Sequence, residues 1–186
     1  ALEQLPTIDF AVVGEPTGMQ PAVCEKGLLV LDCSTYGKSG HAARNEGINA
    51  LYKATETIEA LRTFEFPLAS DLLGKVKLTV TQIQAGTQHN VIPDRCDFVV
   101  DVRTNDRYTN AEAVEILKSR FPEVEITPRS LRLNSSAISI QHPFVRRALF
   151  AGYEPFGSPT LSDQALMPFP SVKMGPGDSS RSHTAD

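Results

Sequence analysis

Hydrophobic and polar positions along the chain follow two periods. Period-two alternation, or a short apolar run, predicts strands at residues 8–13, 27–36, 75–84, 95–103, 124–127 and 171–174. Apolar residues spaced by three or four predict helices that begin at Asn45, Asn110 and His142. The first of these helices is expected to continue to Phe64, with an apolar face made of Ile48, Leu51, Ala54, Ile58 and Leu61.

The order of these elements predicts the fold. Residues 27–127 give strand–helix–strand–strand–helix–strand, which is the ferredoxin-like βαββαβ order. The apolar strands before and after this unit are expected to share one α/β sheet that the unit interrupts. We therefore expect an α/β fold with an inserted α+β lid. Residues 1–21 and 131–186 form the outer α/β part, and residues 22–130 form the lid.

Composition excludes several classes of protein. The 186 residues are 41% hydrophobic and 22% charged, which is typical of a folded chain. A net charge of −4 without a basic stripe argues against nucleic acid, and no apolar run is long enough for a membrane helix. Cys24, Cys33 and Cys96 are too few and scattered for a disulfide framework or a zinc site. We expect buried, reduced thiols in a cytoplasmic protein.

Two candidate metal ligands follow strands of the expected α/β sheet. Glu15 comes directly after the apolar run at 8–13, and His183 follows the strand at 171–174 and a Gly-rich turn. Ligands gather at the carboxyl ends of strands in such sheets, where a carboxylate can bind a cation or act as a base. Imidazole is a common zinc ligand. The alternatives are a solvated loop glutamate and a solvated, helix-capping histidine. The two residues together are more suggestive than either one alone.

Two further residues stand outside the core pattern. His41 lies in a Gly-, Ser- and Lys-containing loop, which could present the imidazole to a partner or a substrate, although a solvated histidine is the alternative. Arg103 ends a strand and could bind a substrate carboxylate through two nitrogens, or it could pair with Asp101 or Asp106 on the surface.

The remaining histidines carry no such signal. His89 and His142 have no convergent polar neighbours in the sequence, so both are expected to be structural.

Five motifs follow one another along nearly the whole chain. They are Val-Val-Gly-Glu-Pro-Thr at 12–17, Gly-Lys-Ser-Gly-His-Ala-Ala at 37–43 with Gly-Ile-Asn-Ala at 47–50, Asn-Val-Ile-Pro at 90–93, Asp-Val-Arg at 101–103, and Gly-Pro-Gly-Asp-Ser-Ser-Arg-Ser-His at 175–183. Together they resemble the M20 metallopeptidase family, which includes acetylornithine deacetylase, succinyl-diaminopimelate desuccinylase, aminoacylases and glutamate carboxypeptidases. The last motif is most similar to acetylornithine deacetylase-like enzymes.

The resemblance implies an activity and an assembly. Family members have a catalytic α/β domain with two zinc (or cobalt) ions, interrupted by a ferredoxin-like lid that forms a homodimer. The resemblance implies a cytoplasmic hydrolase of arginine biosynthesis, which removes an acetyl or succinyl group from an N-acyl amino acid such as acylated ornithine or citrulline. Two alternatives stay open: an M20 dipeptidase or carboxypeptidase, and a free-standing ferredoxin-like binding or dimerisation module without catalysis.

The resemblance also implies roles for individual residues. Glu15 and His183 would each ligate one of the two metal ions. His41 would reach the site of a neighbouring subunit and stabilise the oxyanion of the reaction. The substrate would be held by four residues, with the arginine on its carboxylate: Asn90, Arg103, Gly175 and Gly177.

The chain departs from the family pattern in its metal ligands. The upstream His-x-Asp, the bridging Asp and the Glu-Glu pair have no counterpart, and the chain opens with Ala1. We therefore expect a piece of a longer protein, in which 27–127 folds alone and the flanking segments are mobile or rearranged. This piece is expected to bind no zinc pair and to hydrolyse nothing by itself.

Overall fold

The computed structural model of the chain describes residues 7–179. Its strands are β1 (Ala11–Val13), β2 (Ala22–Glu25), β3 (Leu29–Tyr36), β4 (Gly40–His41), β5 (Lys77–Ala85), β6 (Val91–Ile92), β7 (Arg95–Arg103), β8 (Glu125–Pro128), β9 (Ser136–Ala137), β10 (Phe156–Ser158) and β11 (Ser171–Lys173). The helices include α1 (Ala50–Thr63), α2 (Asn110–Arg120), α3 (Pro143–Phe150) and the short 3-10 helix η2 (Asp163–Leu166). Within the described range, no helix is long and apolar enough to cross a membrane.

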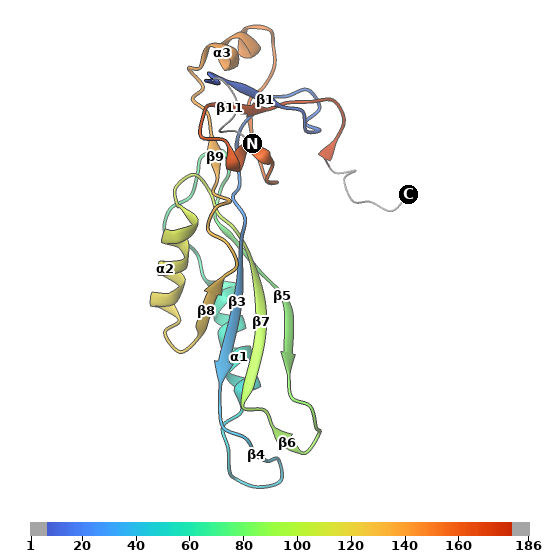
Figure 1. The fold of residues 1–186 in the computed structure, drawn as a ribbon, viewed down its shortest axis with the longest axis vertical. Coiled ribbons are helices and arrows are strands. Elements are labelled where there is room, and N and C mark those ends of the chain that lie inside the picture. The colour runs from blue at the N-terminus through green and yellow to red at the C-terminus, as the bar shows by residue number, and fades with distance from the viewer. Residues whose placement is uncertain (1–6, 180–186) are drawn as a thin grey trace.

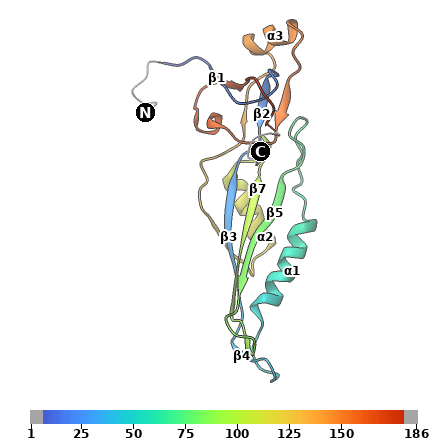
Figure 2. The ribbon, with the colours of Figure 1, turned by 90° about the vertical axis from the view of Figure 1, so that its right-hand side faces the viewer.

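The molecule is elongated (Figure 1). Strands β1 and β11 and helix α3 lie at one end, and the long strands with α1 and α2 fill the middle. The two-stranded ribbon β4–β6 lies at the other end, which the second view also shows for β4 (Figure 2).

The middle of the molecule is a four-stranded antiparallel sheet in the order β5-β7-β3-β8. Taken in chain order these are the second, third, first and fourth strands, which is the ferredoxin-like arrangement that the sequence predicts. The central pair is in continuous register, from Leu29 opposite Val102 to Tyr36 opposite Arg95. We refer to this sheet and its two helices, residues 29–128, as the lid.

One face of the lid sheet carries the core. Every second residue of β3, from Leu29 through Leu31 to Cys33, is buried, as period two requires. These side chains belong to one hydrophobic cluster with residues of both α1 and α2, such as Ala54 and Leu117, so both helices cover the same face. The opposite face of the sheet carries the polar residues of the alternation.

Helix α1 begins later than the hydrophobic period predicts. The structure starts it at Ala50 with Asn49 as its N-cap, whose side chain accepts a 2.9 Å hydrogen bond from the backbone N–H of Leu51. Residues before the cap are held in a loop, because Ile48 exchanges two 2.8 Å backbone hydrogen bonds with Lys38. The predicted start at Asn45 is therefore wrong, and Ile48 is 51% exposed instead of facing the core.

Helix α2 has a different cap from the one predicted. The N-cap is Thr109, which forms a capping box with Glu112. Asn110 is fully buried in the first turn, and its side-chain amide donates to the backbone oxygens of Leu28 and Leu133 at 3.1 and 3.0 Å. Asn110 therefore bonds the two stretches of chain that enter and leave the lid.

The second sheet has five strands and lies at the β1 end of the molecule. The order is β1-β11-β2-β10, and β9 also pairs with β2. Strands β1 and β11 are parallel neighbours, with Ala11 opposite Ser171, so the strands that flank the lid in sequence do share a sheet. Strand β2 falls within the expected lid range of 22–130, yet it pairs with β11, β10 and β9, and the lid sheet itself begins only at Leu29.

Candidate functional site

Glu15 lies in a turn at the carboxyl end of β1. The strand ends at Val13, whose backbone oxygen accepts hydrogen bonds from Glu15 N–H and Met174 N–H, both at 2.9 Å. The side chain of Glu15 is exposed at this edge of the five-stranded sheet. The position is the one at which open α/β sheets present ligands.

Gly175 brings the chain after β11 against this turn. Its backbone oxygen accepts from Thr17 N–H at 3.1 Å and from Met19 N–H at 2.9 Å. A Cβ atom on Gly175 would lie 2.6 Å from the backbone oxygen of Glu15, so the close approach requires glycine. Gly177, with a φ of +88°, accepts from Gly18 N–H at 2.7 Å. The structure therefore brings three of the predicted site residues, Glu15, Gly175 and Gly177, into one double turn.

The residues present can be compared with the needs of a zinc centre. A zinc pair requires several carboxylate and imidazole ligands that converge. Within residues 7–179, no three His, Cys, Asp or Glu side chains are grouped so that they could hold a metal ion. Of the two predicted ligands, Glu15 lies in this range, whereas His183 lies outside the described residues. The described residues alone therefore do not fit a zinc centre.

His41 and Asn90 come together on the ribbon β4–β6. His41 pairs with Val91 across the ribbon, and the N–H of the following residue, Ala42, donates to the backbone oxygen of Asn90 at 2.9 Å. Both predicted site residues are exposed. The ribbon therefore places both residues at the tip of the lid.

The ring of His41 is oriented by its own turn. The backbone N–H of Ala43 donates to Nδ1 of His41 at 3.1 Å, and the carboxylate of Glu46 accepts from the backbone N–H of His41 at 3.4 Å. A neutral imidazole that accepts at Nδ1 carries its proton on Nε2. The exposed Nε2–H is therefore available as a hydrogen-bond donor to another molecule.

The two groups of predicted residues lie far apart within one chain. The ribbon β4–β6 and the strands β1 and β11 are at opposite ends of the elongated molecule (Figure 1). The lid sheet lies between them, and β7 alone, from Arg95 to Arg103, rises about 27 Å at a strand's usual spacing. His41 of one chain therefore cannot act on a ligand bound beside Glu15 of the same chain in this conformation.

Arg103 ends β7 on the side of the lid that faces the five-stranded sheet. Its Nε and Nη2 donate to the two carboxylate oxygens of Asp101 at 2.7 and 3.1 Å, and both side chains are about one-third exposed (31% and 27%). This is the surface pair that the sequence leaves open as an alternative. A substrate carboxylate at this guanidinium would have to share it with Asp101.

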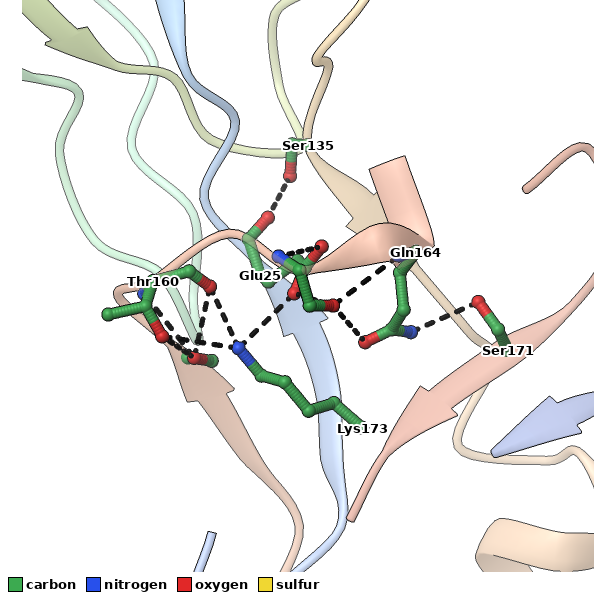
Figure 3. Close-up of polar contacts among 8 residues, drawn as sticks. Glu25, Ser135, Thr160, Gln164, Ser171 and Lys173 are labelled. Carbon is green, nitrogen blue, oxygen red and sulfur yellow. Dashed lines mark hydrogen bonds and ion pairs between the residues drawn. The ribbon is translucent and has the colours of Figure 1, made fainter. Parts of the chain in front are cut away.

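One buried polar cluster was not predicted. Lys173, inside the apolar run at 171–174, forms an ion pair with Glu25 of β2, and both side chains are buried (Figure 3). The sequence contains a signal for it, since a lysine in a buried strand needs a partner for its charge. The partner could not be chosen from the sequence, because Glu25 is about 150 positions away and belongs to another strand.

The lid is recognisable by comparison with known sequences. The sequence profile of the peptidase dimerisation domain, M20_dimer, matches residues 23–126, and the chain belongs to this M20 family. Among its curated relatives, acetylornithine deacetylase of Myxococcus xanthus is 32% identical over 100 residues, which are 50% of this chain and 26% of that protein. Succinyl-diaminopimelate desuccinylase 1 of Alteromonas mediterranea is 28% identical over 127 residues, 64% of this chain and 33% of that protein.

A longer match includes the segments that flank the lid. Acetylornithine deacetylase of Aliivibrio salmonicida is 27% identical over 199 aligned positions, which cover 96% of this chain and 52% of the relative. The chain therefore spans about half the length, or less, of the curated relatives it matches.

Solved structures agree on the fold. A tripeptidase from Staphylococcus aureus matches with a TM-score of 0.67 at 17% identity, over 91% of this chain and 49% of that one. Aminopeptidase PepT from Bacillus cereus matches with a TM-score of 0.65 at 14% identity, over 89% and 48%. The fold of this chain is thus shared with peptidases whose sequences differ widely from it.

Proposed function

We propose that the protein that carries this chain is an amidohydrolase that removes an acetyl or succinyl group from an amino acid such as ornithine or citrulline. Relatives named for deacetylation of acetylornithine and for desuccinylation support this class of substrate. The observation that carries the proposal is the separation of two exposed groups, His41 with Asn90 at one end and Glu15 with Gly175 at the other.

This separation supports a homodimer with shared sites. His41 and Asn90 of one subunit reach the Glu15 edge of the second subunit, and the reverse contact forms the second site. Arg103 stands at the opposite end of β7 from the ribbon, so it belongs with Glu15 of its own chain. The lid of each subunit then serves both as the contact between subunits and as the carrier of two site residues.

The side chains suit the hydrolysis of an amide. Attack of water on the acyl carbon produces a tetrahedral oxyanion, which needs a fixed hydrogen-bond donor. The Nε2–H of His41 is such a donor, because Nδ1 is engaged by Ala43 N–H. The amide of Asn90 and the guanidinium of Arg103 bind the amino-acid part of the substrate, with Arg103 on its carboxylate.

The proposal includes a metal and a compartment. Two zinc ions would complete the site in the whole protein, where Glu15 would ligate one of them and His183 the other, and they would activate the attacking water. The three cysteines are free and buried, which supports a reducing compartment such as the cytoplasm.

The test is subunit complementation in the natural protein that carries this chain. The variants His41→Ala and Glu15→Ala are each expected to lose at least a hundredfold in kcat on N-acetylornithine, N-acetylcitrulline or the N-succinyl analogues. When the two variants are refolded together in equal amounts, half of the dimers are mixed and each has one complete site. About a quarter of the wild-type activity should return.

A matched control distinguishes shared sites from nonspecific rescue. The control mixes Glu15→Ala with Arg103→Ala. One and the same chain supplies both residues to a site, so each site of a mixed dimer carries one defect and activity stays lost. Activity in His41→Ala alone, or failure of the first mixture to recover, would overturn the shared site. A wild-type protein that hydrolyses none of these substrates would favour a binding module.

A further inference from the structure

Glu25 and Lys173 form an ion pair inside the protein (Figure 3). Lys173 Nζ lies 3.2 Å from Oε2 of Glu25, and the side chains are 3% and 0% exposed. Every other ion pair found within residues 7–179 has at least 27% of each side chain exposed, including the Arg103–Asp101 pair. The Glu25–Lys173 pair is therefore shielded from solvent, whereas the other ion pairs are at least partly exposed to it.

Both charges are also hydrogen-bonded. The backbone N–H and the hydroxyl of Ser162 donate to the two carboxylate oxygens of Glu25 at 3.1 and 2.8 Å. Lys173 Nζ donates to the backbone oxygen and the hydroxyl of Thr160 at 2.8 and 3.2 Å. Such partners are what a buried ion pair needs to persist.

The pair lies where the lid joins the five-stranded sheet. Glu25 is the last residue of β2, and the lid sheet starts four positions later at Leu29. The returning chain passes the same point, because the hydroxyl of Ser135 donates to the backbone oxygen of Glu25 at 2.6 Å. Lys173 is the last residue of β11, two positions before Gly175. Glu25 therefore links three segments. It ends the strand before the lid, it accepts a hydrogen bond from the chain that returns from the lid, and it pairs with the strand that leads into Gly175.

Stability alone is a poor explanation for such a pair. Replacing a buried ion pair by apolar side chains of similar volume is often neutral or stabilising, because the desolvation of two charges offsets their attraction. Charged, hydrogen-bonded groups differ from apolar ones in that they accept few alternative geometries. The network is suited to fixing one orientation of the elements that it joins.

We propose that Glu25 and Lys173 are positioning residues that set the angle at which the lid leaves the five-stranded sheet. A long lid magnifies a small change at its base, so this angle decides where the β4–β6 ribbon points. If the proposed function holds, it also decides whether His41 reaches the oxyanion in the partner subunit. The orientation itself is a property of the structure and does not require that function.

The test measures a distance across the junction in the natural protein that carries this chain. Spin labels are attached to cysteines introduced at two exposed positions, Glu123→Cys in the lid and Arg146→Cys in α3. The native thiols are buried and stay unlabelled. Labelled protein is diluted with an excess of unlabelled protein, so that distances within one subunit dominate the electron–electron dipolar signal.

The decisive variant replaces the ion pair by an apolar pair, Glu25→Leu with Lys173→Met. We expect a melting temperature close to that of the wild type and a distance distribution at least twice as broad, or with a displaced mean. The matched control is Glu59→Leu with Arg62→Met, which removes an exposed ion pair within α1 and should leave the distribution unchanged. A folded apolar-pair variant with the wild-type distribution would overturn the proposal.

A milder variant keeps the test decisive if the apolar pair does not fold. Ser162→Ala removes the hydroxyl's hydrogen bond to the Glu25 carboxylate, together with its cap on η2, and leaves both charges in place. We expect a smaller but measurable broadening, and an unchanged distribution in this variant would likewise overturn the proposal. Because the measurement needs no substrate, its outcome is independent of whether the protein hydrolyses N-acyl amino acids.

Discussion

The backbone N–H of Ala43 donates a hydrogen bond to Nδ1 of His41 over 3.1 Å. This contact fixes the exposed imidazole as the Nε2–H tautomer in its neutral form. We expect long-range ¹H–¹⁵N correlation spectra above neutral pH to show a protonated Nε2 and an unprotonated Nδ1 for His41. Substitution Ala43→Pro removes the N–H and should let both tautomers appear. Spectra of the wild type with the proton on Nδ1 would contradict the geometry.

Gly175 and Gly14 make a matched pair for testing the Glu15 turn. A Cβ on Gly175 would meet the backbone oxygen of Glu15 at 2.6 Å, whereas a Cβ on Gly14 would meet nothing within 4 Å. Because backbone cannot move aside as a side chain can, Gly175→Ala should cost about 1–3 kcal/mol in the free energy of unfolding. Gly14→Ala should leave the free energy of unfolding unchanged or raise it by about 0.5 kcal/mol.

Hydrogen exchange locates the damage in these two variants. The amides of Thr17 and Met19 donate to the backbone oxygen of Gly175. Their hydrogen exchange should be faster in Gly175→Ala and unchanged in Gly14→Ala. Equal effects of the two substitutions would mean that the close approach to Glu15 is absent.

The Asp32–Arg129 pair predicts a specific dependence of stability on pH. Hydrogen bonds from Arg129 hold the pKa of the Asp32 carboxyl below its usual value. A carboxyl with a lowered folded-state pKa adds stability above its unfolded pKa of about 3.9, and this is lost as the pH falls through the folded pKa. The gap in urea midpoint between wild type and Asp32→Asn should therefore be present at pH 6 and close towards about pH 2.

The partner provides the control for that pH profile. Both side chains are about half exposed, so the gap should be small and should shrink in high salt. In an Arg129→Gln background, Asp32→Asn should no longer produce a gap that closes on acidification. A gap that persists there would assign the effect to another group.

Thr109 is the N-cap of α2. Its hydroxyl accepts from Glu112 N–H at 3.2 Å, and the Glu112 carboxylate accepts from Thr109 N–H at 2.8 Å. Thr109→Ala should lower the free energy of unfolding by about 1 kcal/mol, as loss of an N-cap does. Thr109→Ser keeps the hydroxyl and should retain most of that stability in the same urea titration. A similar loss in both variants would mean that the methyl group, not the cap, matters.

The three cysteines should be protected from thiol reagents. Burial raises the pKa of the Cys24 thiol to about 11 and that of Cys33 to about 12, and it raises the pKa of Cys96 as well. Since the thiolate is the reactive form, native protein should react negligibly with a disulfide reagent at pH 8. The unfolded chain should react at all three positions. Rapid reaction of the native protein would indicate local opening of the sheets.

The accuracy of the sequence predictions follows the regularity of the pattern. The strand at 95–103 matches β7 at both ends, because apolar residues occupy every second position from Cys96 to Val102 and all of these positions are buried. The ribbon β4–β6 was not predicted, since strands of two residues have no period. The helix start at Asn45 was wrong because Lys38, seven positions earlier, holds the following residues in a loop.

The sequence predicts candidate site residues but not how they are arranged. The motifs located Glu15, His41 and Asn90, yet only the fold shows that the first is remote from the other two. The pairing of Arg103 with Asp101 was one of two alternatives, because a strand places residues two apart on the same side. Glu25 and Lys173 were missed for the opposite reason, since nothing local relates residues in separate strands.

The pairing of β1 with β11 imposes an order on folding during synthesis. Ala11 lies opposite Ser171, and the whole lid is made between them. At 5–20 residues per second, a ribosome needs roughly 8–30 s to make the intervening chain. Throughout that time β1 has emerged without its neighbour, while the lid, whose strands and helices are all present by residue 128, can already be complete. The five-stranded sheet can therefore be completed only after the lid has been made.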